Sequence, residues 1–199
     1  LSMFLSLPAA VALIVGSEQI ISALFGYGSF DELSVSNSAN ALFYFGLGLP
    51  AFALIKVFST FFFANQDTKT PFYISLFSVI LNILISIYFF REIGFIIIPI
   101  ATTISSWFNA IILFVYLKNK DLFNFNELFF AKLIKILLAS IIMGIFFNYL
   151  ILFFENKLIY EYNFKSFYLI LSAFLSLIFY LSFSLFIKAF KYGDIKLKY

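Results

Sequence analysis

Two pairs of residues within apolar sequence have the spacing of neighbours on one face of a helix. Asn82 and Ser86 are four residues apart, and Ile98 and Thr102 are four apart in the apolar stretch that follows. Residues at this spacing lie above one another on a helix. A turn near residues 92–93 would make the two stretches an antiparallel hairpin. Asn82 would then lie level with Thr102, and Ser86 level with Ile98.

These groups offer oxygen atoms of the kind that bind a hard cation. Asn82 has a side-chain oxygen and Thr102 a hydroxyl. A third oxygen can come from the backbone carbonyl of Phe95 or Ile98, because Pro99 has no N–H to donate to the Phe95 carbonyl. Oxygen ligands do not favour transition metals, and carbonyls freed in broken helices hold coupling ions in secondary transporters. The pattern predicts a Na⁺ site in the hairpin. Ordinary hydrogen bonding between two helices is the alternative.

A single lysine lies deep within another apolar stretch. Lys56 is nine residues before Asn65, or about 13 Å along a helix, which is near the midplane of a bilayer core about 30 Å thick. Upstream, Pro50 removes a helix hydrogen bond, and Gly46 and Gly48 permit bending and close approach. This combination predicts a bent helix whose lysine lines a polar transport cavity. The alternative is a lysine that reaches the membrane interface or bonds a neighbouring carbonyl.

The composition places all these residues in a membrane protein. Of the 199 residues, 63% are hydrophobic and 12% are charged, whereas soluble domains contain about 25% charged residues. Soluble catalytic domains and nucleic-acid-binding modules are therefore excluded. The sequence has no His and no Cys, which removes imidazole bases, thiol nucleophiles, disulfides and most zinc sites. We expect neither an enzyme nor a transition metal.

Six apolar stretches are long enough to cross the hydrocarbon core. They run over residues 3–25, 41–64, 72–90, 95–117, 129–154 and 167–187. The stretches are continuous rather than alternating, which favours helices over the strands of a barrel. The predicted fold is an all-α integral membrane protein with six transmembrane helices.

The positions of Lys and Arg predict the orientation of these helices. Of the 13 basic residues, Arg91, Lys157 and Lys165 fall on one side of the membrane, and Lys56 lies within a span. The other nine fall on the opposite side, which is expected to be cytoplasmic and to hold the basic C-terminal tail, 188–199. They are Lys69, Lys118, Lys120, Lys132, Lys135, Lys188, Lys191, Lys196 and Lys198.

Several segments resemble the MurJ (MviN) family of lipid II flippases, which belongs to the MOP exporter superfamily. The most specific match is the loop Gln66-Asp67-Thr68-Lys69-Thr70-Pro71, which follows the matching segment Gly48 to Val57. Further similarity is found in Leu7-Pro8-Ala9-Ala10-Val11, Leu24 to Phe30, Leu81-Asn82, Ala101-Thr102 and Trp107-Phe108-Asn109-Ala110.

The resemblance implies a transporter of fourteen spans, of which this chain corresponds to the last six. Such a protein moves lipid II, an undecaprenyl-pyrophosphate-linked disaccharide-pentapeptide, from the inner to the outer leaflet of the bacterial cytoplasmic membrane by alternating access. Its partners would be lipid II, membrane lipids and the eight preceding spans. Residues 1–117 would form part of the C-terminal transport lobe, 118–128 a cytoplasmic linker, and 129–187 two spans lining a groove for the lipid tail.

The chain departs from the family at one predicted ligand. Related members carry an Asn and an acidic residue one turn apart at the positions of Asn82 and Ser86, and here Ser86 replaces the carboxylate. We therefore expect a weaker cation site. The family's pyrophosphate-binding arginines lie in spans that have no counterpart in this sequence.

Two other functions are compatible with six apolar spans. One is another exporter of the same superfamily, for polysaccharide-linked lipids or drugs, although the Gln66 to Pro71 loop argues against it. The other is a membrane scaffold subunit that transports nothing.

Overall fold

The computed structural model describes residues 2–120 and 127–189, and this part of the chain consists of helices and turns without a strand. An all-α fold is what the continuous apolar stretches predicted. The helices are α1 (Ser2–Val15), α2 (Ser17–Phe25), α3 (Glu32–Ala64), α4 (Lys69–Ile93), α5 (Ile97–Asn119), α6 (Glu127–Phe153), α7 (Glu155–Leu158) and α8 (Lys165–Phe186), with a 3₁₀ turn, η1 (Gly94–Ile96), between α4 and α5.

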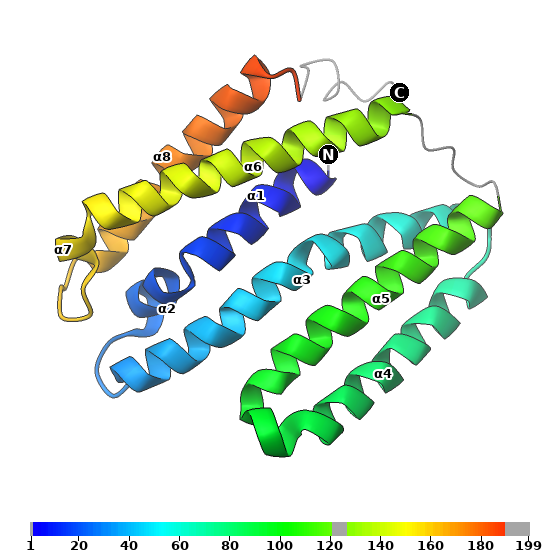
Figure 1. Cartoon of the computed structure of the whole chain (residues 1–199), viewed down its shortest axis with the longest axis horizontal. Coiled ribbons are helices and arrows are strands. Elements are labelled where there is room, and N and C mark those ends of the chain that lie inside the picture. The colour runs from blue at the N-terminus through cyan, green and yellow to red at the C-terminus, as the bar shows by residue number, and fades with distance from the viewer. Residues whose placement is uncertain (1, 121–126, 190–199) are drawn as a thin grey trace.

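The helices account for the six predicted spans. Four helical stretches among the described residues are long and apolar enough to cross a membrane, or five when α1 and α2 count together as one span. One of the four, Lys69–Asn119, contains both α4 and α5. These fold back on each other at Gly94, whose φ is +76° (Figure 1), so that this stretch supplies two crossings.

The first predicted span, 3–25, is not one straight helix. It breaks at Gly16 into α1 and α2, which are bent by 79° relative to each other. A Cβ on Gly16 would lie 2.6 Å from the Phe147 ring of α6, so the backbone passes close to a neighbouring helix here. The polar residues Glu18 and Gln19 follow at the start of α2. Because of the bend, they do not continue along the axis of the apolar helix α1.

The second predicted span, 41–64, lies within a longer helix, because α3 begins nine residues earlier, at Glu32. Asp31 caps the helix by accepting a hydrogen bond from the Ser34 backbone N–H at 2.9 Å. The first turns of α3 are polar, and hydropathy marks only the part of a helix that lies in hydrocarbon. The other four predicted spans begin and end within three residues of α4, α5, α6 and α8.

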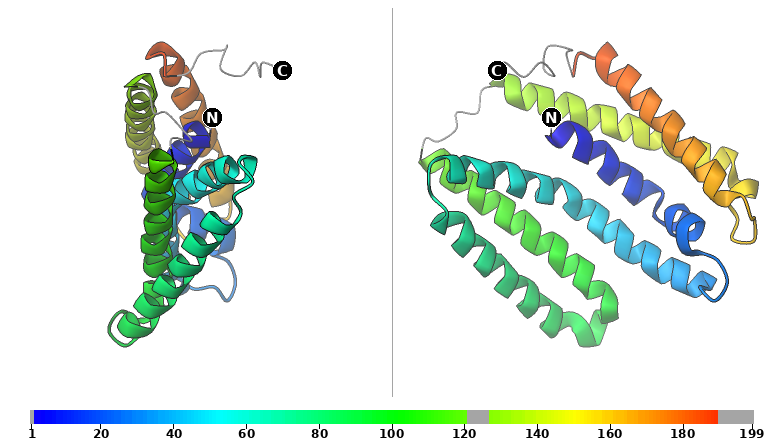
Figure 2. Two further views of the ribbon diagram at one scale, coloured as in Figure 1. Left: turned by 90° about the vertical axis from the view of Figure 1, so that its right-hand side faces the viewer. Right: turned by 180° about the vertical axis from the view of Figure 1, so that it is seen from behind.

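The helices lie side by side in an order that differs from their order in the chain. Figure 1 shows the sequence α4, α5, α3, α1, α6 and α8 across the molecule, and the view from behind in Figure 2 agrees. The helix ends form two opposite edges of the row. One edge contains the start of α4, the end of α5 and the start of α6, and the other contains α2, α7 and the α4–α5 turn. Below, the edge with α2 and α7 is called the outer end.

Two main apolar clusters hold the row together. One joins α1, α2, α6 and α8 and includes Phe4, Met143, Phe147 and Tyr180. The other joins α3, α4 and α5 through buried residues that include Phe62 and Leu113. A smaller cluster of Ile21, Val35 and Ala39 packs α2 against the first turns of α3.

Candidate functional site

Neighbouring helices contact α3 closely at Gly46 and Gly48, where the sequence predicts a bend. A Cβ on Gly46 would lie 3.1 Å from the Ile14 side chain of α1, and one on Gly48 would lie 2.9 Å from Thr103 Oγ1 of α5. Pro50, one turn further on, is buried. The two glycines therefore let α1 and α5 approach α3 on different sides.

Side chains of α5 bond to backbone carbonyls of α3 in the same region. Thr103 Oγ1 donates to the Tyr44 carbonyl at 2.7 Å, and Trp107 Nε1 donates to the Leu47 carbonyl at 3.0 Å. The two donors are four residues apart and share one face of α5. α3 changes direction about halfway along its length (Figure 1), and these bonds brace it there.

Lys56 is exposed on α3. Among the described residues, no side chain or backbone group forms a hydrogen bond or ion pair with it. Phe52, one turn earlier on the same helix face, and Ile55 both line a cavity between α3, α4 and α5. Lys56 thus lies beside this cavity rather than inside it.

The α4–α5 hairpin brings Asn82 and Thr102 together, as the depth argument predicted. Asn82 Nδ2 donates to Thr102 Oγ1 at 3.1 Å and to Ser105 Oγ at 3.3 Å, and Thr102 Oγ1 donates to the Ile98 carbonyl at 2.7 Å. Ser105 is not among the predicted cation ligands; the sequence favours interhelical packing for it, and its bond with Asn82 is such a contact. Ser86 has no side-chain hydrogen bond within the described part of the chain, so the second predicted pair, Ser86 with Ile98, makes no polar contact.

The cavity beside Lys56 has a volume of about 320 Å³. Its lining is uncharged, polar on α5, polar on α4 except for Val79, and apolar on α3. It consists of Phe52, Ile55, Ser75, Ser78, Val79, Asn82, Thr102, Ser105, Ser106 and Asn109.

The specific loop before α4 acts as a helix cap and a tether. Asp67 accepts hydrogen bonds from the backbone N–H of Thr70 at 3.0 Å and from its hydroxyl at 2.8 Å. Lys120 Nζ, at the end of α5, lies 2.7 Å from the Asp67 carboxylate and 5.9 Å from the centre of the Phe62 ring. The loop is shorter than predicted, because Lys69, Thr70 and Pro71 form the first turn of α4.

These contacts favour the charged form of Asp67. The hydrogen bond from Lys120 and those from Thr70 hold the pKa of the Asp67 carboxyl well below its usual range. Asp67 is therefore a carboxylate, the form that pairs with Lys120, throughout the physiological pH range.

A buried lysine joins three distant segments at the outer end. Lys165 Nζ, at the start of α8, is fully buried and donates to the carbonyls of Gly26 and Tyr160, each at 2.6 Å. It also lies 4.4 Å from the centres of the Tyr27 and Tyr160 rings. Ser166 adds a hydrogen bond to Tyr27 at 2.7 Å. We call these five residues the outer joint. The sequence reading counted Lys165 only as an outer positive charge.

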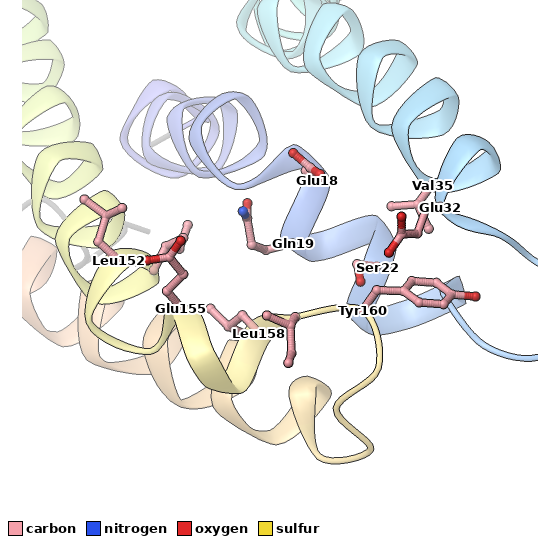
Figure 3. A pocket seen from close by; sticks show the side chains of 11 residues that line it. Glu18, Gln19, Ser22, Glu32, Val35, Leu152, Glu155, Leu158 and Tyr160 are labelled. Carbon is pink, nitrogen blue, oxygen red and sulfur yellow. The ribbon is translucent and has the colours of Figure 1, made fainter.

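A pocket of about 430 Å³ opens beside the outer joint, between α2, α3, α6 and α7. Figure 3 shows Glu18 and Gln19 of α2, Glu32 of α3 and Glu155 of α7 around it, with Ser22 and Tyr160 nearby. Three carboxylates make it unsuited to an anion such as a phosphate. No group of three or more acidic, His or Cys side chains in the described ranges could hold a metal ion.

Two apolar pockets flank α1. One of about 180 Å³ lies between α1, α6 and α8, where Phe4, Met143 and Tyr180 line it. The other, of about 270 Å³, lies between α1, α3, α5 and α6 and is lined by side chains that include Leu7 and Trp107. Both suit apolar chains rather than polar head groups.

Helices that are long and apolar enough to cross a membrane, packed side by side, define a multi-pass α-helical membrane protein. The sequence model of the family "Lipid II flippase MurJ" matches residues 1–172. The probable lipid II flippase MurJ of Rickettsia prowazekii is 35% identical over 153 residues, which are 75% of this chain and 30% of that protein. That of Thermotoga maritima is 36% identical over 143 residues, 72% of this chain and 28% of that protein.

A solved structure of lipid II flippase MurJ in an inward closed conformation has the same fold. It matches 94% of this chain and 37% of its own chain, with a TM-score of 0.76 and 25% sequence identity. The chain belongs to the MurJ lipid II flippase family and is a multi-pass protein of the bacterial inner membrane. It spans about 30% of the length of the relatives it matches.

Proposed function

We propose that the protein carrying this chain moves lipid II from the inner to the outer leaflet by alternating access, as a step in peptidoglycan biosynthesis and cell wall biogenesis. The chain supplies six of its spans. The observation that carries the proposal is the membership of residues 1–172 in the flippase family, together with the fold of a solved flippase. Substrate and partners are thus lipid II, membrane lipids and further spans of the same protein.

The uncharged cavity beside Lys56 supports a transport role over a scaffold role. Polar side chains within membrane helices are costly and usually mark a path for substrate or ions. A scaffold subunit would have no need for a polar cavity between α3, α4 and α5. We place Lys56 at the edge of this path, where its charge can meet an anionic part of the substrate.

The orientation follows from charge. Lys69, Lys118 and Lys120 lie on the ends of α4 and α5 opposite the outer joint. The positive-inside rule assigns their end to the cytoplasm, which puts the C-terminal tail there as well. Residues 121–126 of the linker and 190–199 of the tail lie outside the described residues.

The pair α6 and α8 is the candidate site for the lipid tail. The pocket between α1, α6 and α8 is lined almost entirely by apolar side chains, and its floor includes Phe147. An isoprenoid chain gains free energy by contact with such a surface and needs no polar partner.

A Na⁺ ion bound in the α4–α5 hairpin is the second part of the proposal. The Thr102 hydroxyl is within hydrogen-bond distance of both the Asn82 amide and the Ile98 carbonyl, and all three groups carry hard oxygens. They fit a monovalent cation provided that the Asn82 amide turns its oxygen towards Thr102. If transport requires the bound ion, the ion gradient can drive transport.

The flippase proposal is tested in liposomes. We expect the full-length protein to move a labelled lipid II to the opposite leaflet and the 199-residue chain alone to fail, because alternating access needs two lobes that move against each other. A full-length protein that moves an unrelated amphiphile but not lipid II would favour another exporter of the superfamily.

The cation proposal is tested by thermal unfolding of the full-length protein in Na⁺ and in a large organic cation at equal ionic strength. A bound ion stabilises the folded state by RT ln(1 + [L]/Kd). We expect a Na⁺ increment that Asn82→Ala and Thr102→Val abolish. Identical unfolding of the wild-type protein in both salts would leave only interhelical hydrogen bonding at these residues.

A further inference from the structure

The polar cavity between α3, α4 and α5 has a lining that points to its ligand. Seven of its ten lining residues are Ser, Thr or Asn, and none is charged. Uncharged groups do not compensate the charge of a pyrophosphate. At about 320 Å³, the cavity is at the small end of ligand sites, which measure about 300–1,000 Å³. It therefore suits one uncharged polar group of modest size.

One side chain of this lining has an unused acceptor. Asn109 is 6% exposed, and its Nδ2 donates to Ser75 Oγ at 3.3 Å. Its Oδ1 is buried and has no hydrogen-bond partner among the described residues. Buried polar atoms almost always have a partner. The Asn109 oxygen thus calls for a donor that comes from outside the described residues.

The hydroxyl oxygens of Ser78 and Ser106, which also line the cavity, can accept further hydrogen bonds as well. Ser78 Oγ donates to the Ile74 carbonyl at 2.9 Å, and Ser106 Oγ donates to the Thr102 carbonyl at 2.6 Å. Each hydroxyl uses its one hydrogen on its own helix and keeps lone pairs free. Together with Asn109 Oδ1, they make the cavity rich in acceptors, so it recognises a ligand that brings donors.

The cavity also has apolar lining residues. Phe52 and Ile55 come from α3, and Val79 comes from α4; Phe52 and Val79 are 39% and 55% exposed. A sugar ring combines hydroxyl and amide donors at its edge with an apolar face of C–H groups. A lining that contains both acceptors and an aromatic ring matches that combination.

We propose that this cavity binds the uncharged, hydroxyl-bearing sugar portion of the lipid-linked substrate, through Asn109, Ser78 and Ser106 on one side and Phe52 on the other. The inference rests on the proposed flippase function and names the part of the substrate that these residues contact. The lipid tail has its own candidate pocket between α1, α6 and α8, and Lys56 at the edge of the cavity can meet an anionic part of the substrate.

Binding of two lipids to the full-length protein in nanodiscs tests the proposal. The probes are lipid II and undecaprenyl pyrophosphate, which has neither the sugars nor the pentapeptide. A third lipid, which carries the disaccharide without the peptide, should respond to the substitutions as lipid II does, and a response confined to lipid II would assign the site to the peptide. We expect Ser78→Ala and Asn109→Leu each to raise the Kd for lipid II about 3- to 10-fold, as the loss of one or two hydrogen bonds would. The Kd for undecaprenyl pyrophosphate should not change.

Ser182→Ala is the matched control. Ser182 is exposed on α8, and its hydroxyl donates to its own helix at 2.9 Å, as that of Ser78 does, but it lies outside the cavity. It should leave both Kd values unchanged. Ser78→Ala removes a single atom, so it keeps the test valid should Asn109→Leu fail to fold.

The outcomes separate the two proposals. A wild-type protein that binds no lipid II overturns the flippase proposal, and the sugar site with it. A wild-type protein that binds lipid II while Ser78→Ala and Asn109→Leu leave its Kd unchanged, or weaken both lipids alike, overturns the sugar site alone. Loss of a Na⁺ effect in these variants without a change in lipid II binding overturns it in favour of a cation.

Cysteine labelling tests whether water and substrate reach the cavity. Val79 lines it, whereas Leu84, 61% exposed on the same helix, does not. In a cysteine-free background, we expect a membrane-impermeant thiol reagent to modify Val79→Cys, and lipid II to slow that reaction at least several-fold. Leu84→Cys should remain unmodified. Equal reactivity at the two positions, or no protection by lipid II, contradicts the proposal.

Discussion

Lysines at the outer joint and in the middle of α3 have opposite environments. Lys165 is fully buried, its ammonium group held by two carbonyls and two aromatic rings. Lys56 lies nearer the middle of its helix, is exposed, and has no polar partner among the described residues. Distance along a helix from the membrane surface therefore does not tell which lysine is enclosed by protein.

The difference follows from the backbone around each lysine. Gly26 brings its carbonyl to Lys165 Nζ, and a Cβ there would lie 3.2 Å from that nitrogen and 2.6 Å from the Ser22 carbonyl. Lys56, by contrast, lies on an exposed face of α3, and no described segment brings a carbonyl to it as Gly26 and Tyr160 do to Lys165. The outer joint thus holds together the segments that carry Gly26, Tyr160 and Lys165. The ammonium group of Lys56 is instead free to contact substrate.

The largest expected effect is that of Lys165→Met on stability. The change removes two hydrogen bonds from a charged donor and leaves the Gly26 and Tyr160 carbonyls buried without it. We expect a loss of about 3 kcal/mol in the free energy of unfolding, measured by denaturant or thermal unfolding in detergent.

Lys157→Met is the control for Lys165→Met. Lys157 is exposed and lies 4.8 Å over the Tyr162 ring, a contact worth about 0.5–1 kcal/mol. If the two substitutions destabilise equally, Lys165 is not the centre of the outer joint.

A smaller effect is expected from Lys120→Met at the opposite end. Lys120 pairs with Asp67 but is 45% exposed, so its loss should destabilise less than that of Lys165. Because the folded-state pKa of Asp67 is depressed, its contribution is present above the unfolded pKa of about 3.9 and is lost as the pH falls through the folded value.

The pH dependence of that effect is the measurement. The difference in melting temperature between wild type and Lys120→Met should be constant from pH 5 to 8 and shrink below pH 4. A difference that changes near neutral pH would contradict the assignment to Asp67.

The smallest effect on stability is expected from Lys56→Met. An exposed side chain without a partner should change the free energy of unfolding by less than about 0.5 kcal/mol. Transport by the full-length protein should nevertheless fall at normal expression, since the charge lies beside the cavity. Full complementation of a strain depleted of its own flippase would favour a lysine that only reaches the membrane interface.

The sequence by itself determined the class of the protein and much of its local structure. Apolar composition over about 20 residues decides whether a helix can cross the bilayer, so six spans and their turns could be predicted. Depth counted from one tight turn was enough to pair Asn82 with Thr102, because both lie on adjacent helices of one hairpin. The similarity of the loop before α4 then indicated the family.

Only the tertiary structure decided which polar groups are enclosed. Lys165 meets a carbonyl 139 residues away in the chain, at Gly26. The backbone at Gly16 packs closely against the Phe147 ring of α6, and the cavity lining combines residues of α3, α4 and α5. Hydropathy averages a segment over all faces of its helix. Burial and hydrogen bonding depend on which face of a helix contacts which neighbour. These contacts are set by the packing of helices that lie far apart in the sequence.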